Sequence, residues 1–348
     1  MTDIHALVYV PGLLTRVRGH SAEQQCRGMK APGLEKLLAY SNIDDTTADP
    51  AYGGYENVSA RHFFGDQESF ALAKMALAGE QNSGRDGFWM RADPVRLVAD
   101  RDQLVMAGQW GLDITSREVA DIMESLNHFY QDQQWQFTAP HPLRWYMRIP
   151  QPVHLHTSPL SLVTGKPIDA WLPQGEHATQ FHAVLNEIQM LLHQHPVNIA
   201  RENAGMPVIN SVWFWGQGDT VALPQRAWQG VWVEGDPSVA ALERGFSHYA
   251  DCPFNPVDAA WQWLQRAESG DHFVVINGFW RAHQMSDMRK WQRILIRADK
   301  EWFTPMLKEL GKTLQTLTIA TENRVIKFEK KDKPWSFWSG KRQIQPYL

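Results

Sequence analysis

Residues 195–218 are HPVNIARENAGMPVINSVWFWGQG, a stretch with several local signals in a row. They predict the end of a helix, a turn, a short buried strand and then a glycine-rich loop. In α/β proteins, ligands bind in loops at the carboxyl ends of strands. The stretch therefore predicts an α/β fold and a binding site near its final glycines.

Working outward from this stretch, strand and helix signals alternate towards both ends of the chain. Ala6–Val10 (ALVYV) predicts a buried first strand, and Phe273–Asn277 (FVVIN) has the β-branched run of a central parallel strand. Leu314–Ala320 predicts another buried strand. Helices are expected at Pro32–Tyr40, Phe70–Leu77, Gln180–His195, Val257–Ala267 and Met288–Leu310. This alternation predicts a parallel-sheet core.

The middle of the chain has a different pattern. Trp89–Met106 contains two strand-like pieces, and Ser116 is a suitable N-cap for a helix that ends near Tyr130. Trp135–Phe137 and Arg144–Arg148 predict a pair of strands. We therefore expect a split core with an inserted α+β cap. Residues 1–85 would form the first part of the core and 86–178 the cap. Residues 179–348 would form a helix, the linker motif at 195–218 and the second part of the core.

Composition places the chain among soluble globular proteins. It has 348 residues, of which 43% are hydrophobic and 21% charged, and its formal net charge is −4. The sequence has no basic stripe of the kind that would predict a nucleic-acid or membrane partner. The two cysteines, Cys26 and Cys252, form no disulfide framework, and neither a signal peptide nor a membrane span is predicted. These features favour a cytoplasmic protein.

The segment 195–218 strongly resembles the archaeal-type, cofactor-independent phosphoglycerate mutases, a family of the alkaline phosphatase-like superfamily. The matching positions are His195, Pro196, Val197, Asn198, Arg201, Pro207, Asn210, Gly216 and Gly218. Phe273–Leu310 and Leu317–Trp338 also look like the family's later strands and loops. The resemblance implies an alkaline phosphatase-like split core with an insertion, two divalent metal ions and a nucleophilic serine.

The sequence departs from the family where the metal ligands belong. Pro11 follows the first strand in place of an aspartate, and the loop 277–287 keeps only His283 and Asp287 as counterparts. Thr321-Glu322-Asn323 replaces the family's Asp-His. Ser41 and Ser59 lie in the expected nucleophile region but lack its Gly-Ser-Asp setting. We therefore expect no bound metal cofactor; the remaining catalytic candidates are His283, Asp287 and Glu322, of which His283 and Asp287 are also the metal candidates.

A binding pocket without turnover is the favoured interpretation of the motif. Its predicted ligand-binding residues are Asn198, Arg201, Asn210, Gly216, Gln217 and Gly218. An arginine fork suits phosphate or carboxylate, and asparagine amides can orient a hydroxyl. The alternatives are that Arg201 ties the insertion to the core and that Gly216-Gln217-Gly218 is a tight turn needing positive φ.

Two further groups of residues have ordinary structural interpretations. His154, His156 and His177 favour surface or capping roles over a zinc site, because no carboxylate spacing accompanies them. Asp93, Asp100 and Asp102 lie among arginines, which favours ion pairs over an acid–base pair.

Three functions follow as hypotheses. The favoured one is a regulatory pseudoenzyme that binds a phosphorylated or anionic small molecule, or a protein partner. The second is an active mutase or phosphohydrolase with a rebuilt site, which would use Mn²⁺ or Zn²⁺. The third is a structural or assembly protein that uses an aromatic surface, since the chain has 16 tryptophans.

Overall fold

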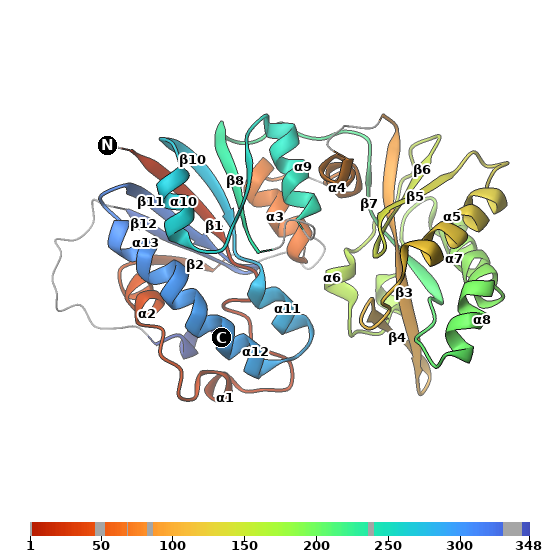
Figure 1. Cartoon of the computed structure of the whole chain (residues 1–348), viewed down its shortest axis with the longest axis horizontal. Helices are drawn as coiled ribbons and strands as arrows, with labels where there is room; N and C mark the ends of the chain where they lie inside the picture. The colour runs from red at the N-terminus through yellow and green to blue at the C-terminus, as the bar shows by residue number, and fades with distance from the viewer. Residues whose placement is uncertain (1, 46–52, 68, 82–85, 236–239, 330–342) are drawn as a thin grey trace. The chain divides into compact units, whose positions relative to one another are not determined.

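The structure is a computed structural model that describes residues 2–45, 53–67, 69–81, 86–235, 240–329 and 343–348 (Figure 1). The chain divides into two compact units: unit 1 is Met1–Asp66 with Leu223–Leu348, and unit 2 is Gln67–Ala222. Within the described ranges, no helix has both the length and the apolar character needed to cross a membrane.

Unit 1 is built on a seven-stranded sheet of order β2-β12-β11-β1-β10-β8-β9. Strand β1 pairs in parallel with β10 and β11, and β8 joins β10 and β9 in parallel. Strands β12 and β2 add antiparallel pairs at one edge. The strands are β1 Ile4–Tyr9, β2 Asn42–Asp45, β8 Trp228–Glu234, β9 Phe254–Val257, β10 Gly270–Val275, β11 Leu314–Ala320 and β12 Arg324–Glu329. The predicted parallel core is thus confirmed, with β1, β10 and β11 at the expected positions.

Helices cover both faces of this sheet (Figure 1). Ala6 and Val8 of β1 face a core that includes Trp291 and Trp302, whereas Tyr9 stacks on Tyr55 at the other face. The helices are α1 Ala22–Cys26, α2 Pro32–Ala39, α3 Tyr55–Phe64, α9 Ala241–Ala250, α10 Ala260–Arg266, α11 Gly278–Gln284, α12 Met288–Ala298, a π-helix Asp299–Phe303 and α13 Thr304–Glu309. Helices α2, α10, α12 and α13 line the first face, and α3 and α9 the second.

Helix α2 obtains its N-terminal cap from a distant part of the chain. Its N-cap residue, Ala31, has no side-chain acceptor. The buried carboxylate of Asp299 instead accepts hydrogen bonds from the backbone N–H groups of Gly33, at 3.2 Å, and Leu34, at 2.8 Å. The π-helix thereby satisfies donors that the first turn of α2 would otherwise leave unpaired.

Substitution of this cap gives a first testable prediction. Asp299→Ala should lower the free energy of unfolding by about 1–2 kcal/mol, because two buried N–H donors lose their acceptor. Asp299→Asn keeps one acceptor oxygen and should lose less. Urea denaturation followed by tryptophan fluorescence measures both changes. Equal stability of Asp299→Ala and the wild type would contradict the capping role.

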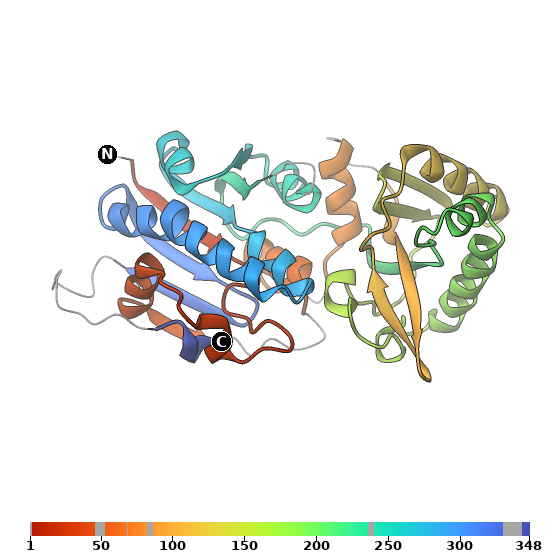
Figure 2. The ribbon, with the colours of Figure 1, turned by 60° about the horizontal axis from the view of Figure 1, so that its bottom comes forward.

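Unit 2 is a five-stranded antiparallel sheet with helices on it (Figure 2). Its strands are β3 Phe88–Asp100, β4 Gln103–Gly108, β5 Gln136–His141, β6 Arg144–Ile149 and β7 Ser211–Gly218. Its helices are α4 Leu72–Gln81, α5 Ser116–Phe129, α6 Leu160–Val163, α7 Ala178–His193 and α8 Pro196–Asn203. Helices α5 and α7 pack on the sheet through a core that includes Trp145, Phe181 and Phe214.

The unit boundaries differ from the expected 86–178. Strand β7 pairs antiparallel with β3, with Phe214 opposite Ala92 and Val212 opposite Pro94. This pairing places the motif segment and α7 in unit 2 rather than in the second part of the core. Helix α4 also belongs to unit 2, where it packs on β7 and β3.

Of two local expectations in unit 2, one needs correction. The N-cap of α5 is Thr115, not Ser116, and Thr115 forms a capping box with Glu118. The two strand-like pieces expected in Trp89–Met106 are confirmed as β3 and β4, which pair antiparallel, and β3 runs through Pro94. Proline is tolerated there because it lacks only one backbone donor, and the neighbouring pairs with β7 remain.

Candidate functional site

The parallel strands of unit 1 end at one edge of the sheet, where α/β proteins bind their ligands. Pro11 and Gly12 follow β1, Asn277 follows β10, and Glu322 follows β11. The Glu322 carboxylate accepts a hydrogen bond from the Gly12 N–H at 2.6 Å and another from the Thr15 hydroxyl at 3.2 Å. Both carboxylate oxygens are therefore engaged with the loop after β1.

The same loop packs tightly against α11 and α12. The Trp291 indole donates to the Gly12 carbonyl at 2.8 Å. Gly12 has φ +79°, and a Cβ there would lie 2.9 Å from the backbone carbon of Phe279. Only glycine fits this position, because the residue has a left-handed backbone conformation and lies against the backbone of α11. The loops after β1, β10 and β11 thus fill part of the strand-end edge with their own contacts.

A group of aromatic and carboxyl side chains lies beside these loops. The ring of Tyr55 stacks on Tyr9, with centroids 5.8 Å apart, and on Trp280, at 6.3 Å. The Tyr55 hydroxyl donates a hydrogen bond to the Glu243 carboxylate of α9. His62 packs on Tyr9, with ring centroids 5.6 Å apart. Together with Glu322, these residues make the strand-end cluster of unit 1.

Burial changes the protonation of this cluster. It raises the pKa of Glu243 to about 7 and that of Glu322 also to about 7. It lowers the pKa of His62 to about 4. Desolvation thus favours the neutral form of each group, so the cluster carries little charge in mildly acidic solution.

Tyr55, His62 and Glu243 were not predicted from the sequence. One signal could have found Glu243, because it lies among alanine and leucine on the apolar face of an amphipathic helix. Nothing in the sequence marks Tyr55 as its partner, since the two residues are 188 positions apart.

The predicted catalytic and metal candidates each have a local partner. His283 of α11 stacks on Trp280, with centroids 5.7 Å apart. Asp287 is the N-cap of α12 and accepts from the Lys290 N–H at 2.8 Å. Across the part of the chain that the structure describes, no group of three His, Cys, Asp or Glu residues could hold a metal ion.

The motif residues lie together in unit 2, where their polar groups bind the chain itself. His195 is the N-cap of α8, and its Nδ1 accepts from the Val197 N–H at 3.2 Å. The Asn198 amide donates to the carbonyls of Leu192 and Ile209 at 2.8 and 2.7 Å, and its oxygen accepts from the Ile209 N–H. Asn198 therefore holds the end of α7 against the segment that leads into β7.

Arg201 is only 1% exposed and has three partners. Its Nε donates to the Pro207 carbonyl at 2.8 Å, its Nη1 to the Glu118 carboxylate at 2.8 Å, and its Nη2 to the Leu112 carbonyl. All three partners belong to unit 2. Arg201 thus joins α8 to the start of α5. The alternative interpretation was that it ties the insertion to the core, but none of these partners lies in unit 1.

The remaining motif residues also have structural contacts. Asn210 exchanges two hydrogen bonds with the backbone of Leu97, at 2.7 and 2.8 Å. The Gln217 amide donates to the Leu155 carbonyl at 2.6 Å. Gly216 and Gly218 have positive φ, and a Cβ on Gly218 would lie 2.7 Å from Ala71 beside α4. These contacts give the motif a packing role, and ligand binding by it stays a prediction.

Of the acidic and histidine groups, Asp93 and His177 have structural contacts of the kind favoured above. The buried Asp93 pairs with Arg91 at 2.6 Å and accepts from the Trp215 indole at 2.8 Å. His177 accepts a hydrogen bond from the His154 backbone N–H at 3.1 Å. Neither contact forms a metal site.

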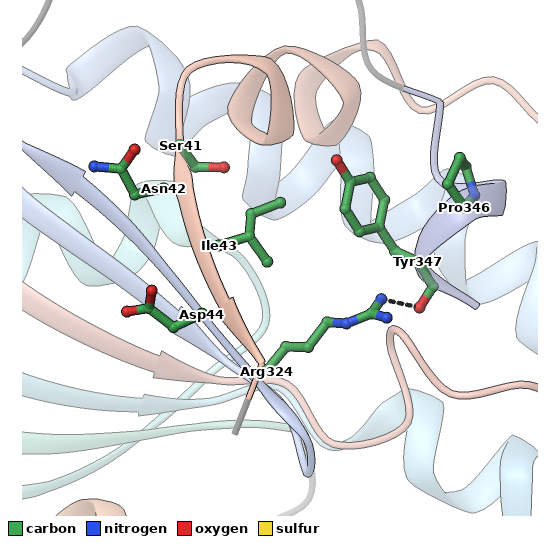
Figure 3. A pocket seen from close by; sticks show the side chains of 7 residues that line it. All are labelled: Ser41, Asn42, Ile43, Asp44, Arg324, Pro346 and Tyr347. Atoms are coloured by element: carbon green, nitrogen blue, oxygen red, sulfur yellow. Dashed lines mark hydrogen bonds between the residues drawn. The ribbon is translucent and has the colours of Figure 1, made fainter. Parts of the chain in front are cut away.

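An open hollow lies elsewhere on unit 1, beside the edge strand β2 (Figure 3). Its lining residues are Ser41, Asn42, Ile43, Asp44, Arg324, Pro346 and Tyr347. The Arg324 guanidinium donates to the Tyr347 carbonyl across it, as Figure 3 shows. Apart from Ser41, which lies in the expected nucleophile region, this hollow contains none of the residues that the sequence singled out.

No protein-family model matches the chain. The 2,3-bisphosphoglycerate-independent phosphoglycerate mutase of Methanothrix thermoacetophila is 36% identical over 63 residues, or 18% of this chain and 16% of that protein. The enzyme of the same name from Methanosarcina acetivorans is 24% identical over 172 residues, or 45% of this chain and 43% of its own. The chain therefore matches less than half the length of each relative.

Solved structures give a likeness of fold. The PH0037 protein of Pyrococcus horikoshii aligns with a TM-score of 0.54 and 14% identity, over 95% of this chain and 89% of its own. The cofactor-independent phosphoglycerate mutase of Thermoplasma acidophilum aligns with a TM-score of 0.44 and 14% identity, over 99% and 94%. The first likeness supports the α/β architecture with a parallel sheet.

Proposed function

Because the chain is a divergent relative of the 2,3-bisphosphoglycerate-independent phosphoglycerate mutases, we propose that it has lost their metal-dependent turnover and acts by binding. In this proposal it is a regulatory protein whose ligand is a phosphorylated or anionic small molecule, or a protein partner. The observation that carries the proposal is the engagement of Glu322 with Gly12 and Thr15, which uses a strand-end carboxylate to join two loops.

The residues at the strand ends do not fit two divalent ions. Such ions need several carboxylate and imidazole ligands around an open position. Pro11 has no side-chain donor, and Asn277 and Asn323 have amides where the resembled family has ionisable ligands. Asp287 is already the cap of α12. This donor set supports a loss of the two-metal chemistry.

Metal analysis with an activity assay tests the proposal. The purified chain, incubated with Mn²⁺ or Zn²⁺ and then desalted, should retain well under one equivalent of metal and should not interconvert 2- and 3-phosphoglycerate. Two bound equivalents with turnover would overturn the proposal and favour an active mutase with a rebuilt site.

A matched variant guards against a contaminating enzyme. Asp287→Asn keeps the helix cap but removes the carboxylate charge. Turnover that belongs to this chain should fall in that variant, whereas turnover from a contaminant should not. In the same preparations, 3-phosphoglycerate that binds without turnover should raise the melting temperature, because a ligand that binds only the folded state stabilises it.

A further inference from the structure

Helix α12 has a strongly divided surface. At about 100° per residue, Trp291, Leu295 and Ala298 lie on one side, where they are buried in the core of unit 1. On the opposite side lie Arg289, Arg293, Ile296 and Arg297, which we call the arginine face. The side chain of Ile296, at one edge of this face, is 52% exposed.

Among the described residues of unit 1, acidic side chains neutralise only part of the arginine face. Arg297 pairs with Glu234 at 2.7 Å and Glu301 at 3.6 Å. Arg289 and Arg293, by contrast, form no ion pair or hydrogen bond with any residue that the structure describes.

The carboxylates nearest in the chain or on adjoining elements are already used. Asp287 caps α12, Asp299 caps α2, and Glu23 of the adjoining α1 pairs with Arg27 at 3.7 Å. Helix α1 adjoins α12 through Gln292, which donates to the Gln25 carbonyl at 2.9 Å. Counted over the residues that the structure describes, the face therefore keeps a net positive charge.

This arrangement is unfavourable for the isolated helix. Arg289 with Arg293, and Arg293 with Arg297, are like charges four residues apart, and each such pair destabilises a helix. The chain as a whole has a net charge of −4, so a general excess of basic residues does not account for the face. The half-exposed Ile296 adds an apolar contact surface beside the charged one.

We propose that the arginine face docks an acidic, amphipathic segment of a partner protein. Guanidinium groups pair with carboxylates in a bidentate geometry, and arginine is enriched where protein interfaces gain most of their energy. Ile296 favours a protein over a phosphate backbone, because interfaces between proteins combine apolar contacts with polar ones. The inference rests on the proposed binding function and assigns it a surface and a partner chemistry.

Fluorescence anisotropy with a defined probe tests the inference. The probe is a labelled helical peptide of about 15 residues, with glutamates four apart and a leucine between them, and its control has glutamine for glutamate. The acidic peptide should bind the full chain, and the control should not. The double variant Arg289→Glu/Arg293→Glu should weaken binding by about tenfold or more, since two attractions become repulsions.

Two further variants separate the arginine face from net charge and from phosphate binding. Arg101→Glu/Arg117→Glu changes the net charge equally at exposed positions of unit 2 and should leave binding unchanged. Ile296→Ser should weaken binding about fivefold, because an apolar contact is lost. Circular dichroism and thermal melting should show each variant folded like the wild type.

Three results would overturn the inference. The first is no binding of the acidic peptide at low salt. The second is equal weakening by the two double variants. The third is binding of duplex DNA or anionic vesicles that Arg289→Glu/Arg293→Glu abolishes and Ile296→Ser leaves unchanged, which would assign the face to phosphate. None of these readouts depends on metal content or turnover, so failure here is distinct from failure of the proposed function.

Discussion

Arg201→Ala should lower the free energy of unfolding of unit 2 by about 3–5 kcal/mol. The guanidinium is 1% exposed and donates to the Leu112 and Pro207 carbonyls and to the Glu118 carboxylate. Alanine would leave these acceptors without their donor and would open a cavity between α8 and the start of α5. Urea denaturation, followed by amide hydrogen exchange in unit 2, measures the loss.

The same substitution tests the anion-binding interpretation of the motif. If Arg201 acted only as an anion ligand, the wild type would exceed the variant in stability only when phosphate or phosphoglycerate is present. The structural role instead predicts the full loss in buffer without such anions. Arg117→Ala, on the exposed side of α5, is the matched control and should change stability by less than about 0.5 kcal/mol.

Stability should also depend on the protonation of Glu243. Burial raises the pKa of this carboxyl from its ordinary value of 4.5 to about 7, so the folded state binds its proton more tightly than the unfolded state. The stability that comes from this tighter proton binding is therefore fully present below pH 4.5 and is lost as the pH rises to about 7. The shift corresponds to a loss of about 3 kcal/mol between these limits.

Glu243→Gln isolates this contribution from other titrating groups, including Glu322 and His62. Glutamine stays neutral and can still accept the hydrogen bond from the Tyr55 hydroxyl. The variant should match the wild type near pH 5 and should be more stable at pH 8, by up to about 3 kcal/mol. Urea denaturation at pH 5, 6, 7 and 8 gives the difference. A difference that stays constant with pH would contradict the assigned burial of Glu243.

Most of the secondary structure follows from local sequence patterns. The β-branched runs that predict β1, β10 and β11 need only short-range information, because burial on both faces leaves a continuous apolar signature. Helices α2, α5 and α7 follow from their amphipathic spacing. Less regular elements were missed, such as α3, whose first turn follows two glycines, and α9, which places a glutamate on its buried side.

The unit boundary could not be found in this way. A change of local pattern near residue 86 favoured a cap that ends at 178. The partner of β7 is β3, about 120 residues earlier, and only their pairing shows that the motif belongs to unit 2. Local propensity does not determine which strands pair over such a separation.

The sequence by itself determined the parallel-sheet core, the likeness to phosphoglycerate mutases and the absence of several metal ligands of that family. These are properties of residue type and local order. Only the tertiary structure decided what Arg201, Asp299, Glu243 and Glu322 contact. The physical reason is that the free energy of a polar group depends on its burial and on its hydrogen-bond partners. For these residues, most of the partners come from elements far away in the chain.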